Sequence, residues 1–198
     1  MTSLFARVFR PFTTSSSKMA AAPVTVPEGA EVATLAAGCF WGVEHLYVKH
    51  FGHGKGVLET RVGYIGGATD DPTYRAVCSG TTGHAEATQL VFDPKKVSYR
   101  DLLLFFYRMH DATQLNRQGP DVGTQYRSAI FYHSPEQEAT AREVTDAVSK
   151  NWYKKQVATE IIKAGKWYNA EEYHQLYLDK NPHGYECPSH FIRDFPPL

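Results

Sequence analysis

The sequence has few cysteines, no long hydrophobic run and no excess of charge of either sign. Its three cysteines, Cys39, Cys78 and Cys187, are odd in number and widely spaced in a chain of 198 residues. This pattern argues against a secreted disulfide framework and a paired Cys-x-x-Cys metal site, and fits reactive thiols in a reducing compartment. No apolar stretch approaches the roughly 20 residues of a membrane span. The 21 basic and 21 acidic residues balance, so we expect neither nucleic acid nor a membrane as a partner.

Acidic residues are missing altogether from the first 27 positions. This segment contains Arg7, Arg10 and Lys18 among many Ser, Thr and Ala residues, a composition typical of a mitochondrial transit peptide. Met19 offers a second start, which would give a cytoplasmic form. We therefore predict a disordered targeting leader over 1–27. A single catalytic domain is expected over 28–198, with a flexible C-terminal tail from about residue 180.

Strand-like and helix-like runs alternate along the rest of the chain. Hydrophobic patterns, turn residues and helix caps predict strands at 31–36, 57–64, 89–92, 127–132 and 157–162, and helices at 40–50, 99–109, 135–152 and 171–178. We expect the second and third strands to be antiparallel, because no helix is predicted between them. The pattern indicates an α+β sandwich of the split β-α-β kind. Two long loops, 68–86 and 110–126, are candidates for the functional site.

Cys39 lies between an apolar strand and a predicted helix, in the segment Gly38-Cys39-Phe40-Trp41-Gly42. Backbone N–H groups at a helix N-terminus favour negative charge, so this position is expected to lower the pKa of the thiol and make it a nucleophile. The alternative is a small buried hydrophobic residue. The flanking glycines favour the first interpretation, because they are expected to leave the sulfur accessible.

The two long loops carry further candidates. Glu86 ends the first loop just before a buried strand, where desolvation would keep it protonated as a general acid; the alternative is a solvated surface acid. We expect His84 to bond the loop backbone, since the His-x-Glu pattern lacks the Pro-Cys-x-x-Cys of a zinc deaminase. In the second loop, Asp121 and Tyr126 could orient a polar ligand or bond the loop to itself. Arg127 is expected to pair with an acid structurally.

Several motifs, in order, resemble those of A-type peptide-methionine sulfoxide reductases, a family acting on the S epimer of methionine sulfoxide. The matching segments are Gly38 to Gly42, Tyr64 to Gly67, Pro72 to Arg75, Val77 to Glu86, Asn116 to Ser128, Ala170 to Gln175 and Asn181 to Tyr185. The resemblance covers about residues 34 to 190. It implies a ferredoxin-like α+β core with a long C-terminal coil.

The same resemblance implies roles for individual residues. Cys39 would attack the sulfoxide sulfur, with Phe40 and Trp41 holding the S-methyl group, a role that suits aromatic rings. Glu86 would protonate the sulfoxide oxygen. The remaining substrate-binding positions would be Tyr74, Tyr126 and Asp121.

Recycling is expected to use a second thiol. Attack by Cys39 leaves a sulfenic acid, which another thiol can condense to a disulfide. The resemblance places that thiol in the tail, at Cys187, with thioredoxin reducing the Cys39–Cys187 pair; Cys78 is expected to be structural. No metal, flavin or nucleotide motif is present. We therefore expect no cofactor and a monomer acting on methionine sulfoxide, in proteins or free.

Two other functions fit parts of the sequence. A Cys–His–Asp acyl-transfer hydrolase would use Cys39 with one of the nine histidines, but it leaves the aromatic pair and the tail cysteine unexplained. A redox-sensing or zinc-binding module would instead combine Cys39, Cys78, Cys187 and His84.

Overall fold

A mixed β-sheet of six strands forms the centre of the protein. The computed structural model describes residues 25–198, so all but three residues of the predicted leader lie outside it. The strands follow the order β7-β6-β1-β3-β2-β8 across the sheet. Their bounds are β1 Glu31–Ala37, β2 Val57–Ile65, β3 Ala85–Phe92, β6 Ser128–Tyr132, β7 Glu160–Lys163 and β8 Trp167–Asn169.

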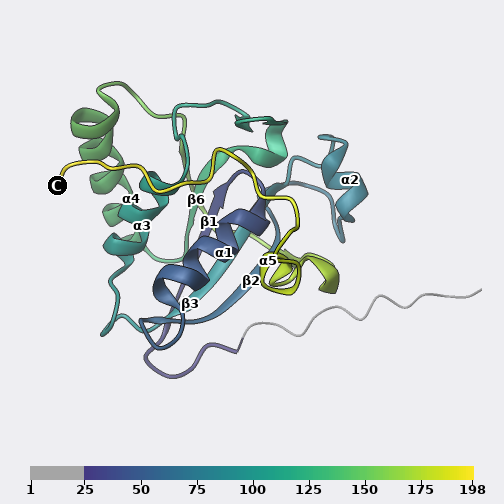
Figure 1. Cartoon of the computed structure of the whole chain (residues 1–198), viewed down its shortest axis with the longest axis horizontal. Coiled ribbons are helices and arrows are strands. Elements are labelled where there is room, and N and C mark those ends of the chain that lie inside the picture. Colours follow the sequence, from purple (N-terminus) through teal and green to yellow (C-terminus); the bar gives the residue numbers. More distant parts are fainter. Residues whose placement is uncertain (1–24) are drawn as a thin grey trace, which may run out of the picture.

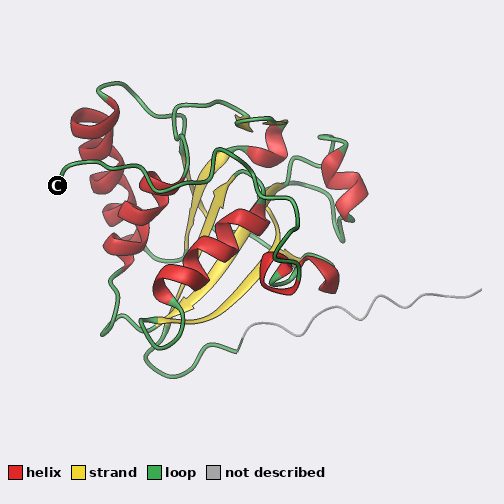
Figure 2. Cartoon of the chain, viewed as in Figure 1, coloured by secondary structure: helices red, strands yellow, loops and turns green. Residues whose placement is uncertain are grey.

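Helices α1, α3 and α4 pack against this sheet (Figures 1 and 2). The helical elements are α1 Phe40–Phe51, α2 Tyr74–Cys78, α3 Tyr99–Met109, α4 Pro135–Val148, the 3-10 turns η1 Thr124–Tyr126 and η3 Glu172–His174, the π-helical turn η2 Ser149–Tyr153, and α5 Tyr177–Lys180. Helix α3 begins with a capping box between Ser98 and Asp101. Helix α4 begins at Pro135 after the N-cap Ser134, as the sequence predicts.

The succession β1-α1-β2-β3-α3-β6 gives the ferredoxin-like core its topology. Its four strands lie in the order β6-β1-β3-β2, and each neighbouring pair is antiparallel. This confirms the predicted α+β fold and the antiparallel pairing of the second and third strands. Strand β7 extends the sheet by parallel pairing with β6, and the short strand β8 pairs with β2 at the other edge.

Hydrophobic residues cover both faces of the sheet. The larger cluster joins Leu35 and Ile130 of the sheet to Leu46, Phe106 and Val144 of the helices. On the opposite face a smaller cluster contains Ala36, Ile65 and Phe131, with Trp167 packed against it. Alternation along β1 therefore sends Leu35 and Ala36 to different clusters, as the two-residue period of a strand requires. The strand ends at Ala37, where Gly38 turns the chain toward α1.

The C-terminal segment 181–198 contains no helix or strand, yet it is held along its length. It crosses the molecule to end beside α3 and α4 (Figure 1). Near its end, the Phe195 ring stacks on Trp152 at 4.8 Å between centroids, and the Trp152 indole donates to the Pro196 carbonyl at 2.9 Å. Arg108 donates to the Phe195 carbonyl at 2.7 Å. These contacts hold the tail against the domain at a point well beyond Cys187.

Some predicted boundaries differ from the structure. The two long loops contain α2 and the hairpin of β4 Arg117–Gln118 and β5 Asp121–Val122; β3 begins at Ala85, and β8 was not predicted. The helix expected over 171–178 divides into η3 and α5. The Gln175 side chain pairs with both backbone groups of Val62, and Leu176 then takes φ +51°. A continuous helix cannot pass through such a left-handed residue.

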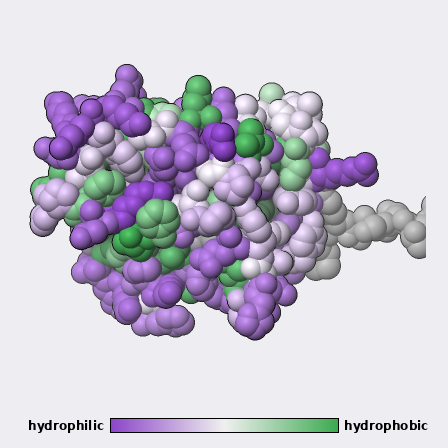
Figure 3. Space-filling model, turned by 45° about the horizontal axis from the view of Figure 1, so that its top comes forward, coloured by the Kyte–Doolittle hydropathy of each residue, from purple (hydrophilic) through white to green (hydrophobic). Residues whose placement is uncertain are grey.

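Most of the surface seen in Figure 3 is hydrophilic, and its hydrophobic residues form small separate groups. Within residues 25–198, none of the helices is long and apolar enough to cross a membrane.

Candidate active site

Cys39 is the N-cap residue of α1, two positions after the end of β1. Gly38 turns the chain between the two elements with φ +95°, a conformation that favours glycine. The Cys39 side chain is only 7% exposed. The predicted position at a helix start is therefore correct, but the sulfur is largely covered.

The predicted lowering of the Cys39 pKa is wrong for this structure. Burial raises the pKa of the thiol well above its ordinary value, and the nearby Glu86 carboxyl raises it further. The Trp41 backbone N–H lowers the pKa, as expected at a helix N-terminus, but desolvation has the larger effect. In the unliganded protein at neutral pH, Cys39 is therefore a thiol.

Glu86 lies one residue into β3 and is 1% exposed. Its Oε2 accepts a hydrogen bond from the Phe40 backbone N–H at 3.1 Å, which ties the carboxyl group to the residue next to Cys39. Burial raises the pKa of Glu86 to about 8, with a further upward contribution from Asp121 and a lowering by the Phe40 N–H. The prediction of a desolvated, protonated carboxyl group agrees with this geometry, and the alternative of a surface acid does not.

The half-buried phenols of Tyr74 and Tyr126 lie on the same side of the site. Burial raises the pKa of each, and both feel the charges of Glu86 and Cys39. The tyrosine hydroxyls are therefore proton donors throughout the neutral range. Cys78 lies against them: burial raises the pKa of Cys78, and hydrogen bonds from Tyr74 and Tyr126 lower it. The sequence did not indicate that Cys78 borders the site.

Phe40 and Trp41 form an aromatic wall beside Cys39. Phe40 is fully buried, with its ring centroid 6.5 Å from that of Trp41 and 6.0 Å from that of Tyr64. Trp41 is partly exposed and stacks on Tyr177 at 3.8 Å and 17°. The edge of the Tyr185 ring approaches it at 6.5 Å. Trp41 is therefore the partly exposed part of this wall, and Phe40 is its buried part.

Two residues of the segment Ala170 to Gln175, for which the sequence predicts no role, hold this wall in place. The Trp41 indole N–H donates to Nδ1 of His174 at 3.0 Å. Glu171 accepts hydrogen bonds from the Tyr64 hydroxyl at 2.9 Å and the Tyr74 backbone N–H at 3.0 Å. Burial lowers the pKa of His174 to about 4, so its ring is neutral and can accept at Nδ1. The sequence signal that could have indicated these roles was the spacing of Glu171 and His174, three residues apart.

The C-terminal tail packs against the start of α1 and the second loop, through His190 and Tyr185. The Tyr185 hydroxyl donates to Oδ1 of Asp121 at 2.9 Å. Cys187 is 1% exposed, and its thiol approaches the Gln118 carbonyl at 3.6 Å. Burial raises the pKa of Cys187 to about 11. The Cys187 sulfur lies close enough to Cys39 that its charge would raise the pKa of Cys39. The fold thus brings Cys39, Glu86 and Cys187 together from three distant parts of the chain.

Known proteins are similar to this chain over most of its length. The sequence profile described as "Peptide methionine sulfoxide reductase" matches residues 31–193. A "Probable peptide methionine sulfoxide reductase" of Schizosaccharomyces pombe is 53% identical over 164 residues, covering 82% of this chain and 96% of its own. The chain belongs to the peptide methionine sulfoxide reductase family. It is therefore an oxidoreductase that acts on methionine sulfoxide.

Solved structures of Mxr1 from Saccharomyces cerevisiae resemble this reductase. The reduced form has a TM-score of 0.80 and 44% identity, with 85% of this chain and 94% of that chain covered. Mxr1 in complex with Trx2 has a TM-score of 0.60 and 26% identity, with 86% and 96% covered. The reductase fold predicted from the motifs is thereby confirmed.

Two other residues singled out in the sequence, His84 and Arg127, make structural contacts in and next to the loops of the reductase. Nδ1 of His84 accepts from the Gly67 backbone N–H at 3.1 Å, and Nε2 lies 2.8 Å from the Thr69 carbonyl. Arg127 pairs with Glu160 at 3.2 Å. Both structural expectations are confirmed. Within the described part of the chain, no three His, Cys, Asp or Glu side chains are grouped to hold a metal ion.

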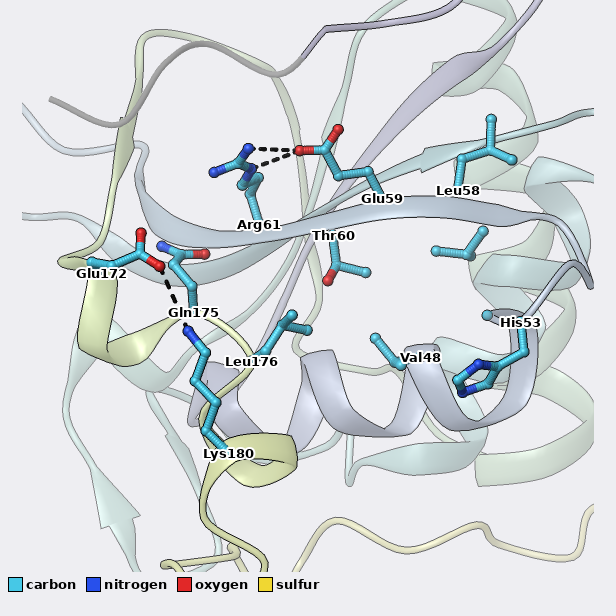
Figure 4. A pocket seen from close by; sticks show the side chains of 12 residues that line it. Val48, His53, Leu58, Glu59, Thr60, Arg61, Glu172, Gln175, Leu176 and Lys180 are labelled. Atoms are coloured by element: carbon cyan, nitrogen blue, oxygen red, sulfur yellow. Dashed lines mark hydrogen bonds and ion pairs between the residues drawn. The ribbon is translucent and has the colours of Figure 1, made fainter.

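A groove of about 430 Å³ lies elsewhere on the reductase, between α1, β2 and the segment around α5 (Figure 4). Its charged side chains include the pairs Arg61–Glu59 at 2.7 Å and Lys180–Glu172 at 3.5 Å. Leu176 and Gln175 form part of its wall. The segment 171–180 thus borders this groove while its residues His174 and Tyr177 contact Trp41.

Proposed function

We propose that this protein reduces the S epimer of methionine sulfoxide, in proteins and as the free amino acid, with Cys39 as nucleophile and Glu86 as general acid. The observation that carries the assignment is the hydrogen bond from the Phe40 N–H to Glu86, 3.1 Å long. It fixes a buried carboxyl group with a pKa of about 8 beside the cysteine. A sulfoxide oxygen leaves poorly unless it is protonated, so the reaction needs this pairing.

The substrate enters with its S-methyl group against Phe40 and Trp41 and its oxygen toward Glu86. Tyr74 and Tyr126 donate hydrogen bonds to that oxygen. Asp121 acts on the arrangement through its charge, which raises the pKa of Glu86. In this orientation the substrate sulfur faces the Cys39 sulfur.

In the first step, the Cys39 sulfur attacks the substrate sulfur while Glu86 protonates the oxygen. The sulfur–oxygen bond of the substrate breaks and the oxygen passes to Cys39, which leaves methionine and a Cys39 sulfenic acid. The thiol proton returns to Glu86. The balance is one thiol and one sulfoxide giving one sulfenic acid and one thioether, with Cys39 oxidised by two electrons.

In the second step, the Cys187 thiol attacks the Cys39 sulfenic sulfur and releases water, forming a disulfide. A thioredoxin dithiol then reduces that disulfide through a mixed disulfide and is itself oxidised. The complex between Mxr1 and Trx2 supports thioredoxin as the reductant. The protein acts as a monomer and without a bound cofactor.

A cysteine hydrolase is not supported, since the family shown by the comparisons is a reductase family. The acid-free composition of residues 1–27 supports delivery to mitochondria, with synthesis from Met19 giving a cytoplasmic form. Fusing residues 1–27 to a fluorescent protein tests delivery: diffuse cytoplasmic fluorescence would contradict it.

The proposed chemistry is tested with the two separated sulfoxide epimers of a short peptide and a thioredoxin-coupled assay. Wild-type protein is expected to turn over the S epimer only, and Cys39→Ser to turn over neither. Turnover by Cys39→Ser would remove Cys39 as the nucleophile. Reduction of the R epimer at a comparable rate would contradict the stereochemical assignment.

A further inference from the structure

The tail contains a tight turn that joins Cys187 to a buried histidine. The His190 backbone N–H donates to the Cys187 carbonyl at 2.9 Å, which closes a four-residue β-turn with Pro188 at its second position. Proline favours that position because its φ is already set for the turn. Cys187 and His190 therefore occupy the two ends of one compact unit, and holding one end restricts the other.

His190 is the buried end of this turn, and it bonds to the chain just before the nucleophile. The His190 ring is 5% exposed, and Nε2 lies 2.7 Å from the Ala37 carbonyl. A carbonyl can only accept, so Nε2 carries the proton and Nδ1 has a lone pair. Nδ1 is buried without a hydrogen-bond partner. The contact joins His190 to a residue two positions from Cys39.

Three glycines form the surface on which the turn sits. A Cβ on Gly42 would lie 2.3 Å from Nδ1 of His190, and a Cβ on Gly119 would lie 2.0 Å from Oγ of Ser189. A Cβ on Gly38 would also lie 3.3 Å from Nε2 of His190. The glycines beside Cys39 were expected to leave the sulfur accessible. The space at Gly42 is instead occupied by the imidazole of His190.

We propose that His190 is a positioning residue for recycling, which docks the Cys187 turn on Gly42 and Ala37 so that the Cys187 thiol is held beside Cys39. This inference rests on the proposed function, because it assigns His190 to the disulfide-forming step alone. Holding two reacting groups together raises their effective concentration, and releasing one end of the tail lowers it. His190 contacts neither the substrate nor the reacting atoms.

The test separates the two chemical steps in single-turnover experiments without reductant. Methionine release measures the first step. Loss of the second free thiol, that of Cys187, measures disulfide formation, and dimedone traps the sulfenic acid that has not yet reacted. In His190→Ala, methionine release is expected at the wild-type rate, while disulfide formation slows about 10-fold or more and dimedone labelling of Cys39 rises. His190→Gln, which can still donate to the Ala37 carbonyl, is expected to recover part of the rate.

Gly42→Ala supplies an independent test, because alanine favours the interior of α1 but its methyl group displaces His190. Gly42→Ala is expected to slow disulfide formation as His190→Ala does. The double variant is expected to be no slower than His190→Ala, since the clash is removed. Gly165→Ala is the matched control, because a Cβ there meets nothing within 4 Å.

The outcomes distinguish this inference from the proposed function. Unchanged disulfide formation in His190→Ala, or fully additive effects in the double variant, would overturn the role of His190 while leaving the reductase chemistry intact. Absence of methionine release from the wild-type protein would contradict the proposed function itself. Thermal unfolding of each variant separates loss of docking from loss of folding.

Discussion

The indole N–H of Trp41 donates to Nδ1 of His174, at 3.0 Å and across 133 positions of sequence. The interaction fixes the orientation of the partly exposed Trp41 ring, two residues after Cys39. It requires a neutral His174, because an imidazolium would have no lone pair for the indole, and burial supplies that neutral form by lowering the pKa of His174 to about 4. The orientation of the aromatic wall thus depends on His174, a residue far in sequence from the segment Gly38 to Gly42.

Replacing His174 should loosen Trp41. His174→Leu removes the acceptor, and leaving the part-buried indole N–H unpaired is expected to cost about 1–3 kcal/mol of unfolding free energy. Because the wall is displaced while Cys39 and Glu86 remain, KM should rise more than kcat falls. Urea unfolding and steady-state kinetics measure the two effects. His183→Leu is the control, since His183 is exposed in the same segment, and an equal effect there would contradict the assignment.

The Glu86 carboxyl group should produce a falling limb in the pH dependence of methionine release. Its pKa of about 8 means that it is protonated below that pH and loses the acidic proton above it. Glu86→Gln is expected to slow release about 10²–10⁴-fold at pH 6–7, with the ratio to wild type narrowing above pH 8. Single-turnover rates from pH 6 to 9.5 give this ratio. A ratio near one throughout would exclude Glu86 as the acid.

Removing the charge of Asp121 should shift the pH at which the rate of methionine release declines. The Asp121 charge raises the pKa of Glu86, so Asp121→Asn should lower it and shift the decline in rate to lower pH. The asparagine oxygen can still accept from the Tyr185 hydroxyl, so the tail contact is preserved. The same single-turnover titration measures the shift. A limb that stays in place or moves upward would contradict this coupling.

The two remaining cysteines should differ in their effect on recycling. Cys187→Ser is expected to release about one methionine per protein and then stop, even with thioredoxin present. Cys78→Ser should continue to turn over, because Cys78 contacts Tyr74 and Tyr126 and takes no part in the proposed disulfide. A thioredoxin-coupled assay distinguishes them. Sustained turnover by Cys187→Ser would transfer the resolving role to another thiol.

The sequence predicted the fold where local signals agreed with tertiary structure. Helix α3 has a capping box and helix α4 a proline at its first turn, and both begin where predicted. Strand β8 has only three residues, and its place in the sheet depends on pairing with β2. The break at Leu176 depends on Gln175 reaching Val62, a contact across 113 residues. No local pattern contains that information.

The raised pKa of Glu86 was predicted from the sequence, whereas the raised pKa of Cys39 was not. Motifs identified Cys39, Glu86 and Cys187, and the fold brings them together. The predicted sign of the Cys39 pKa shift was wrong, because the helix N-terminus is a local feature while the burial that raises the pKa depends on tertiary packing. His174 and His190 were missed for a similar reason. Each acts through a partner more than 100 residues away.

The burial of Cys187 has a consequence for the protein under oxidative stress. Burial raises the pKa of Cys187 to about 11, so this residue is a thiol at neutral pH, and thiolates rather than thiols react with peroxide. Peroxide is therefore expected to react only slowly with the buried Cys187 sulfur. In the proposed mechanism, the resolving thiol would therefore stay reduced under the oxidative conditions that create the substrate, until Cys39 forms a sulfenic acid.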